Sequence, residues 1–291
     1  MKHAYLILAH NEFEILDRLI KTIDDERNDI FLHIDAKVSE LPKIETNHSR
    51  LYILEDRVDV KWADVTVMEA ELNLFGKAAN TDQYEYYHLL SGVDMPIKSQ
   101  DYIHNLFSSH SGKEFIGFYQ GDTEKEIDRK VRRIHLFSRS FRDEPSISNL
   151  IKRIIRSAYI RIQELVNYKR GRDINFKKGT QWLSITNDLV RLLIKNRSEI
   201  LDLYQNSFCC DEIVIQTVCW NSTFKNKLFD SSDEGRGCMR EIHWEKNIIK
   251  DWEDKDFGYL MKSDKLFARK FNSKSINVVD KILQEVKLNK S

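Results

Sequence analysis

The sequence is poor in residues that break or cross-link a chain. Its 291 residues include only three prolines, ten glycines and four cysteines. So few prolines and glycines leave little room for disordered segments. The hydrophobic fraction of 41% is sufficient for a buried core. We therefore expect a folded chain with a buried core.

The cysteines do not form a recognisable framework. Cys209 and Cys210 are adjacent, and neighbouring cysteines rarely bridge each other. Cys219 and Cys238 stand alone, and none of the four has the spacing of a zinc site. Scattered thiols are typical of a reducing compartment, so we expect free, partly buried thiols in a cytoplasmic protein.

The chain also lacks an excess of one charge and a long apolar run. Its 46 Lys and Arg residues balance 46 Asp and Glu residues. A general nucleic-acid-binding protein normally carries a basic excess, so we expect no nucleic-acid partner. No apolar run approaches the roughly 20 residues of a membrane helix. The N-terminal run over 4–9 is too short for a signal peptide and instead indicates a buried strand.

Short apolar runs alternate with helical patterns in the N-terminal part of the chain. Strands are predicted over 5–9, 30–34, 51–54 and 87–90, and helices over 13–23 and 66–79. This alternation predicts an α/β fold, a mostly parallel sheet covered by helices on both faces. Ligands bind such sheets at the carboxyl ends of the strands, where we expect Asp35 and Asp94.

The middle of the chain is basic. Residues 122–142 carry seven Lys and Arg residues and few apolar ones. Residues 147–168 then form an amphipathic helical pattern in which cations lie among the apolar positions. This pattern predicts a helix that packs its apolar face on the core and leaves a solvated basic face. The alternative is a peripheral contact with an anionic membrane surface.

The strand and helix signals return after residue 176. We predict a strand over 182–186 and helices over 188–195 and 212–220. No repeat or linker divides the chain, so we expect one domain over 1–291. Within it we distinguish a nucleotide-binding half (1–110), a basic helical insertion (111–175) and an acceptor and catalytic half (176–291).

The carboxylates of the chain are poorly arranged for a metal. A metal-dependent nucleotide-sugar transferase needs closely spaced carboxylates near the fourth strand, where only Asp94 is available. The one Asp-x-Asp triplet, at 254–256, lies in a charged stretch far downstream, where we expect solvated side chains. Without a metal, fixed cations must neutralise a diphosphate. Arg240, Arg269 and Lys270 are the candidates, and a surface ion pair is the alternative for each.

Two further carboxylates could take part in chemistry. Asp35 follows a predicted strand and could accept hydrogen bonds from a nucleotide, or it could cap a helix. Glu212 follows Asp211 at a predicted helix start and is the best candidate for a general base. The alternative for Asp211 and Glu212 is a capping pair without chemistry.

Several short motifs, in order along nearly the whole chain, resemble those of glycosyltransferase family 14. They occupy residues 11–12, 33–35, 62–63, 70–72, 89–98, 178–182, 211–212 and 266–271. This family includes the core-2/I-branching β-1,6-N-acetylglucosaminyltransferases and the peptide O-xylosyltransferases. The resemblance implies a GT-A-like fold and an inverting transfer from a UDP-sugar without a metal or other cofactor.

The resemblance also implies roles for individual residues. The family's catalytic glutamate matches Glu212, and its diphosphate-binding lysine and arginine match Lys270 and, with a gap, Arg240. The remaining matches on the donor side are Asp35, Trp62, Asp94 and Arg269. Acceptor contacts would come from a loosely matching stretch and its neighbours, namely Glu124, Lys130, Arg133, Trp182 and Asp211.

The function implied is that of a bacterial-type enzyme that builds a surface polysaccharide or glycoconjugate. It would move a sugar, first of all N-acetylglucosamine, from UDP to a glycan or a lipid-linked oligosaccharide. Such an enzyme would work in the cytoplasm, at the inner face of the membrane. The first alternative is a xylosyl- or hexosyltransferase with the same site. The second is a catalytically silent glycan- or nucleotide-binding subunit of a polysaccharide-assembly complex.

Overall fold

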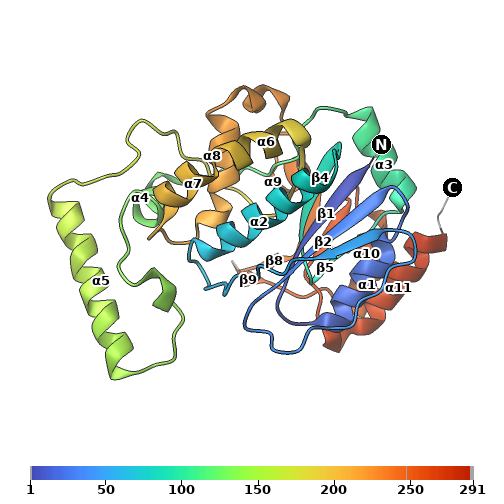
Figure 1. Ribbon diagram of the computed structural model, residues 1–291, viewed down its shortest axis with the longest axis horizontal. Coiled ribbons are helices and arrows are strands. Elements are labelled where there is room, and N and C mark those ends of the chain that lie inside the picture. Colours follow the sequence, from blue (N-terminus) through green and yellow to red (C-terminus); the bar gives the residue numbers. More distant parts are fainter. Residues whose placement is uncertain (1, 247, 289–291) are drawn as a thin grey trace.

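The fold is built on a five-stranded sheet with helices on both faces (Figure 1). The computed structural model describes residues 2–246 and 248–288. In spatial order the strands are β3 (Arg50–Ile53), β2 (Asn28–Ile34), β1 (His3–Ala9), β4 (Tyr86–Ser91) and β6 (Leu183–Thr186). The first four are parallel and β6 runs antiparallel to β4. The predicted α/β class with a mostly parallel sheet is confirmed.

The central strands are apolar along their whole length because both of their faces are covered. In β1, Tyr5 and Ile7 belong to one hydrophobic cluster, whereas Ala4 and Leu6 belong to another on the opposite face. All four side chains are fully buried. The first cluster is covered by α1 (Phe13–Ile23), α3 (Gln100–Ser109), α10 (Phe257–Lys262) and α11 (Ile276–Leu288). The second is covered by α2 (Thr66–Thr81), α6 (Asn187–Lys195), α7 (Arg197–Tyr204) and α8 (Val214–Trp220).

A second, three-stranded sheet extends the first one at its carboxyl edge. Its central strand β10 (Phe267–Arg269) runs antiparallel to β5 (Asp94–Pro96) and parallel to β7 (Arg240–Ile242). Asp94 lies just beyond the carboxyl end of β4, as predicted, and it also opens β5. The register of β5 and β10 pairs Asp94 with Arg269. The short strands β8 (Trp244–Glu245) and β9 (Ile248–Ile249) form a hairpin nearby.

Further helices complete the described part of the fold. They are α4 (Glu124–Lys130), α5 (Ile147–Leu165) and the short α9 (Glu234–Cys238). Within the described residues, short 3₁₀ helices cover residues 138–140, 210–212, 223–227, 254–256 and 273–275. The helix predicted over 212–220 is thus divided, because Glu212 ends a 3₁₀ turn and α8 begins at Val214.

Helix α5 projects away from the sheet, at the left of Figure 1. Of its 19 residues only Gln163 is buried. The prediction that this helix packs its apolar face on the core is therefore wrong. None of the helices within the described residues is long and apolar enough to cross a membrane. The four cysteines are free thiols, as predicted, and three of them are buried.

Candidate active site

The carboxyl ends of several strands meet at one edge of the sheet and bring polar side chains together. Asp35 follows β2 and is 5% exposed. Its Oδ1 accepts a hydrogen bond from the Lys37 backbone N–H at 2.9 Å, and its Oδ2 lies 2.7 Å from Lys37 Nζ. His10 follows β1 within electrostatic reach of Asp35 and Arg269. The predicted position of Asp35 at a strand end is confirmed.

Arg269, the last residue of β10, is held rigidly at this edge. Its Nη1 lies 2.6 Å from Asp94 Oδ1, and its guanidinium carbon lies 4.3 Å from the centre of the Trp182 ring. The other oxygen of Asp94 accepts a hydrogen bond from the Ser91 backbone N–H at 2.9 Å. Burial raises the pKa of Asp94, and the neighbouring Arg269 opposes that shift. The cation of Arg269 is therefore fixed by one carboxylate and one aromatic face.

The next residue, Lys270, has a fixed backbone and a more accessible side chain. Its carbonyl accepts a hydrogen bond from the backbone N–H of Trp252 at 2.9 Å. The indole N–H of Trp252 donates to the Arg269 carbonyl, also at 2.9 Å. The Lys270 side chain is 38% exposed, and its Nζ lies 3.9 Å from Asp251 Oδ1. So long an ion pair leaves the ammonium able to meet an anion at the strand ends.

The second group of polar residues surrounds Glu212. Its Oε2 lies 3.3 Å from Lys130 Nζ and 3.6 Å from Lys178 Nζ. Both lysines also pair with Glu126, at 2.7 and 3.0 Å. Burial opposes the charge of Lys130, but Glu212 and Glu126 outweigh burial and raise its pKa. The Glu212 side chain is 38% exposed and can still reach a substrate. We call Glu126, Lys130, Lys178 and Glu212 the base cluster.

One short segment, residues 178–182, connects the base cluster with the strand ends. At its start, Lys178 pairs with Glu212, and the Gly179 N–H donates to the Glu212 carbonyl at 2.9 Å. At its end, Trp182 lies against the guanidinium of Arg269. A single stretch of chain thus contacts both the carboxylate of Glu212 and the guanidinium of Arg269. This is the geometric feature from which the chemistry of the site follows.

Two carboxyl groups are buried behind this segment. Asp211 Oδ1 and Glu71 Oε2 are buried and have no hydrogen-bond partner within the described residues. The other oxygen of Glu71 accepts a hydrogen bond from Gln181 Nε2 at 2.6 Å. Burial raises the pKa of Glu71 well above its ordinary value. Burial, followed by the charge of Glu212, raises the pKa of Asp211 to about 6.

Trp62 lies beside the base cluster. Its ring is 45% exposed and stacks under the guanidinium of Arg142, whose central carbon is 3.8 Å from the ring centre. The ring also meets Phe208 edge-on at 5.6 Å. Phe208 in turn lies 5.9 Å from Lys130 Nζ. An exposed aromatic ring is therefore linked to the base cluster through Phe208, and its predicted role on the donor side stays a prediction.

Arg240 does not lie where the sequence predicted it. Its side chain is buried at the start of β7, and burial lowers its pKa to about 10. It donates to the carbonyls of Cys238 at 2.6 Å and Leu183 at 2.8 Å, and to Ser184 Oγ at 3.1 Å. The guanidinium also covers the ring of Phe267 at 4.3 Å. Because its side chain is buried and Nη1 and Nη2 already donate to carbonyls and to Ser184, Arg240 is not available to a diphosphate in this conformation.

The predicted acceptor residues are also only partly brought together. Lys130 belongs to the base cluster, but Arg133 is 4% exposed and donates to Asp128 Oδ2 at 2.8 Å and the Gln163 carbonyl at 2.9 Å. Arg133 is thus occupied inside the protein, which corrects its predicted acceptor role. Glu124 is exposed at the start of α4. Trp182 is 7% exposed beneath Arg269.

Sequence reasoning missed two members of the base cluster. Lys178 opens the motif at residues 178–182, but the sequence predicted no chemical role for this lysine. Glu126 lies two residues beyond the predicted Glu124, in a stretch where its many charged neighbours hide it. An acid and a base four residues apart on a helix, here Glu126 and Lys130, were the available signal.

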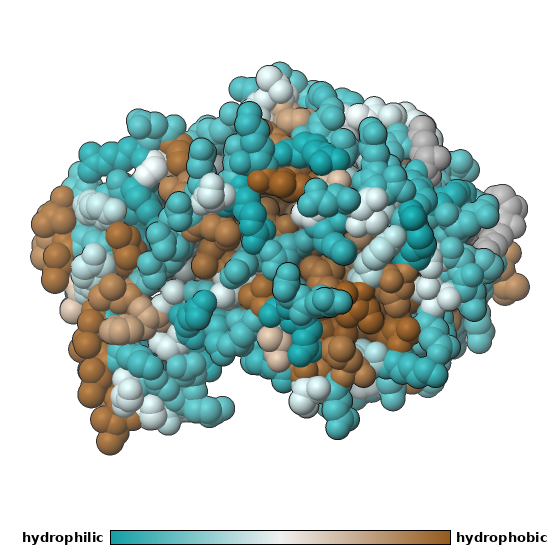
Figure 2. Space-filling view, in the orientation of Figure 1, coloured by the Kyte–Doolittle hydropathy of each residue, from teal (hydrophilic) through white to brown (hydrophobic). Residues whose placement is uncertain are grey.

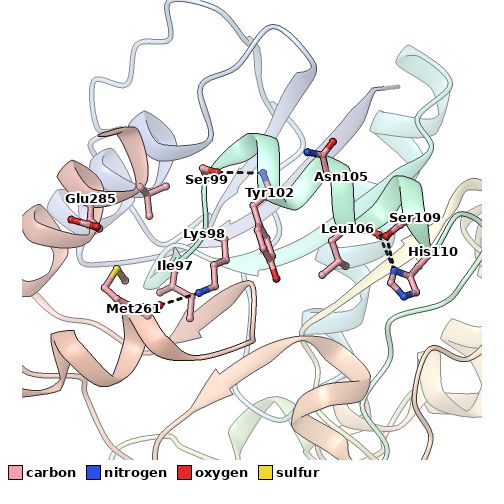
Figure 3. A pocket seen from close by; sticks show the side chains of 11 residues that line it. Ile97, Lys98, Ser99, Tyr102, Asn105, Leu106, Ser109, His110, Met261 and Glu285 are labelled. Carbon is pink, nitrogen blue, oxygen red and sulfur yellow. Dashed lines mark hydrogen bonds between the residues drawn. The ribbon is translucent and has the colours of Figure 1, made fainter. Parts of the chain in front are cut away.

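Within the part of the chain that the structure describes, no metal cluster competes with this site. No group of three or more His, Cys, Asp or Glu residues there could hold a metal ion. In the triplet at 254–256, Asp254 pairs with Lys281 at 2.8 Å and Asp256 caps its own turn. A cavity of about 670 Å³ lies elsewhere, beside α3, α10 and α11, where Lys98 Nζ donates to the Met261 carbonyl at 3.1 Å (Figure 3). None of the predicted site residues lines it.

Comparison with known families settles the family of the chain. The model of the Core-2/I-Branching enzyme family matches residues 3–269. The chain belongs to this family of glycosyltransferases.

Curated relatives of this core-2/I-branching family member include two mammalian proteins. Both are called beta-1,3-galactosyl-O-glycosyl-glycoprotein beta-1,6-N-acetylglucosaminyltransferase. The human protein is 30% identical over 139 residues, and the bovine one is 28% identical over 136 residues. Each match covers 45% of the chain and 31% of the relative. The matched part is thus about a third of the length of either relative.

Among solved structures, the chain aligns with a crystal structure of TarS residues 1–349 from S. aureus. The TM-score is 0.26 and the sequence identity is 10%, over 47% of this chain and 43% of the other. A likeness at this level carries no argument about function.

The close contact between residues 117 and 179 can be tested by a substitution that adds one methyl group at residue 179. A Cβ at Gly179 would lie 1.8 Å from the Gly117 carbonyl oxygen. Gly179→Ala should therefore lower the free energy of unfolding by about 1–3 kcal/mol or more and displace Lys178 from Glu212. Gly76→Ala is the matched control, because its Cβ would meet nothing within 4 Å and it lies inside α2. We expect that variant to be more stable by about 0.5–1 kcal/mol in urea unfolding. Equal effects of the two changes would refute the close contact.

The buried Asp211 carboxyl should make stability depend on pH. Its folded pKa of about 6 lies above the ordinary 3.8, so protonation favours the folded state. The stability from this group is complete below the ordinary pKa and is lost as the pH rises through about 6. Asp211→Asn avoids that loss and should stabilise the protein by on the order of 1–3 kcal/mol at about pH 8.

Urea unfolding at about pH 8 and about pH 4 measures this effect, with the exposed Asp202→Asn as control. The gain from Asp211→Asn should shrink towards zero at the lower pH, and Asp202→Asn should give none at either pH. A gain that is the same at both pH values would contradict the assignment.

Proposed function

We propose that this chain is an inverting glycosyltransferase that works without a bound metal. It moves N-acetylglucosamine from a UDP donor to a hydroxyl group of a glycan, which is free or carried by a lipid, in the synthesis of a surface polysaccharide or glycoconjugate. Membership of the core-2/I-branching family supports transfer of a sugar. The printed names of the relatives support N-acetylglucosamine as the first donor to test.

One observation carries the proposal. Residues 178–182 contact both the half-exposed carboxylate of Glu212 and the guanidinium of Arg269. Glu212 pairs with Lys178 at 3.6 Å at one end of this segment, and Arg269 lies over Trp182 at the other. Lys270 follows Arg269 directly with its ammonium half-exposed. A base and a cationic leaving-group site on one rigid support are what a single displacement needs.

In the proposed reaction, Glu212 accepts the proton of the acceptor hydroxyl as its oxygen attacks the anomeric carbon. The bond between that carbon and the β-phosphate oxygen breaks, and its electron pair leaves with UDP. Attack from the face opposite UDP inverts the anomeric configuration. The products are the extended glycan, UDP and a protonated Glu212, which then returns its proton to solvent.

The negative charge that develops on UDP is the second requirement. Lys270 is the proposed partner of the diphosphate, with Arg269 beside it, because its ammonium is half-exposed directly after β10 and its only ion pair within the described residues is long. Asp35 would accept hydrogen bonds from the nucleotide. Positive charges that are already in place before the reaction can stabilise the departing diphosphate as a bound metal ion would. Arg240 is left out because backbone carbonyls hold its guanidinium.

Release of UDP from a panel of UDP-sugars in excess EDTA tests both the donor and the metal. UDP-N-acetylglucosamine should turn over with a glycan acceptor at the same rate with and without the chelator. Faster release from UDP-xylose or UDP-hexoses would keep the site and change the donor. Activity that EDTA abolishes and Mn²⁺ restores would refute the metal-free proposal. Binding of donors without turnover on any acceptor or on water would indicate a silent binding subunit.

Glu212→Gln should lower turnover about 10²–10⁴-fold, because the amide cannot accept the hydroxyl proton. UDP should still bind, since Glu212 lies in the base cluster and not at the strand ends. Glu199→Gln, an exposed change on α7, is the matched control and should keep full activity. Normal turnover of Glu212→Gln with intact UDP binding would show that another group is the base.

A further inference from the structure

Helix α5 is attached to the protein through its polar side. The Gln163 side chain exchanges two hydrogen bonds with the backbone of Ile134, each 2.9 Å long. Arg156 donates to the carbonyls of Leu136 and Phe137, both at 2.8 Å. A helix on the surface of a globular protein normally packs its apolar stripe on the core and turns its polar residues outward. In α5 this order is reversed.

The apolar stripe of α5 faces outward. Its side chains recur every three or four residues and are 43–85% exposed. They are Ile147, Leu150, Ile151, Ile154, Ile155, Ile162 and Leu165. In Figure 2 hydrophobic atoms line the left margin of the molecule, where Figure 1 places α5. A contiguous apolar row of this length on a protein surface indicates an interaction site.

Positive charge accompanies the apolar row. The helix carries four cations, Lys152, Arg153, Arg156 and Arg161, and a single acid, Glu164. Arg153 and Arg161 are exposed, and neither is paired with a carboxylate in residues 2–246 or 248–288. Exposed cations beside a row of Ile and Leu are the features of a helix that lies in the headgroup region of an anionic bilayer.

We propose that the outward face of α5 docks this protein on an anionic lipid bilayer. The Ile and Leu side chains would enter the boundary between headgroups and acyl chains, and Arg153 and Arg161 would meet lipid phosphates. Charge favours this occupant over a second copy of the chain. Each α5 helix has a net positive charge, so two α5 helices packed against each other would bring like charges together.

The docking face is connected to the base cluster by hydrogen bonds of Arg133 and Lys130. Arg133 donates to Asp128 on α4, to the Gln163 carbonyl on α5, and to the Tyr168 carbonyl just beyond it. Lys130, also on α4, pairs with Glu212 at 3.3 Å. The position of α5 on a bilayer would therefore determine how the site faces the membrane. The docking itself is independent of the proposed function and can be tested without any sugar.

Co-sedimentation with vesicles tests the proposal. The full chain should bind vesicles of phosphatidylcholine mixed with phosphatidylglycerol, bind pure phosphatidylcholine much more weakly, and dissociate as salt is raised. The double variant Ile154→Asn with Ile162→Asn should bind about 10–100-fold more weakly, because two apolar side chains no longer enter the bilayer. Arg153→Gln with Arg161→Gln should lose the preference for phosphatidylglycerol.

The matched control is Leu41→Asn with Ile248→Asn, which removes two exposed apolar side chains outside α5 and should bind like the wild type. Equal thermal unfolding of all variants confirms their fold. Sedimentation without vesicles gives the oligomeric state. No binding by the wild type, or equal losses in the α5 and control variants, would overturn the proposal. A dimer that Ile154→Asn with Ile162→Asn dissociates would also overturn it, by assigning the face to a second copy.

Discussion

The close approach of two glycines is the constraint on which the candidate site depends. Gly179 lies so near the Gly117 carbonyl that no side chain fits between them, and this contact fixes the segment 178–182 on the sheet. Lys178 and Trp182 then project from fixed backbone towards Glu212 and Arg269. Because catalysis by a general base requires placement within a fraction of an ångström, a rigid support of this kind matters more than any one side chain on it.

Arg240, Arg269 and Lys270 differ in how deeply they are buried and in what neutralises their charge. Arg240 is buried, and its charge is tolerated because carbonyl oxygens and an aromatic ring surround it. Arg269 is mostly buried and depends on Asp94, whereas Lys270 keeps a long ion pair and partial exposure. Only a cation of the last kind can exchange its partner for a substrate at little cost, since removing a partner from a buried pair is expensive. The proposal therefore assigns the diphosphate first of all to Lys270.

Much of the fold could be predicted from the sequence, because apolar runs and helical spacing report burial directly. The helix over 13–23 and the strand ends that carry Asp35 are as predicted. The partners of Arg240 and Arg133 could not be predicted, since a guanidinium can donate to a backbone carbonyl as well as to a phosphate. The orientation of α5 could not be predicted either. A helical period identifies an apolar face but does not say whether a core or a different surface covers it. The division of the chain into three functional parts stays a prediction.

The central claim is that a fixed cation, and not a metal, holds the diphosphate. Calorimetric titration of UDP into the protein in excess EDTA tests it most directly, because it needs neither the acceptor nor turnover. The account predicts that the wild type binds UDP under these conditions and that Lys270→Met weakens binding about 10–100-fold. Lys262→Met, at the end of α10, is the matched control and should leave the affinity unchanged. Equal UDP affinity in the wild type and Lys270→Met would contradict the account.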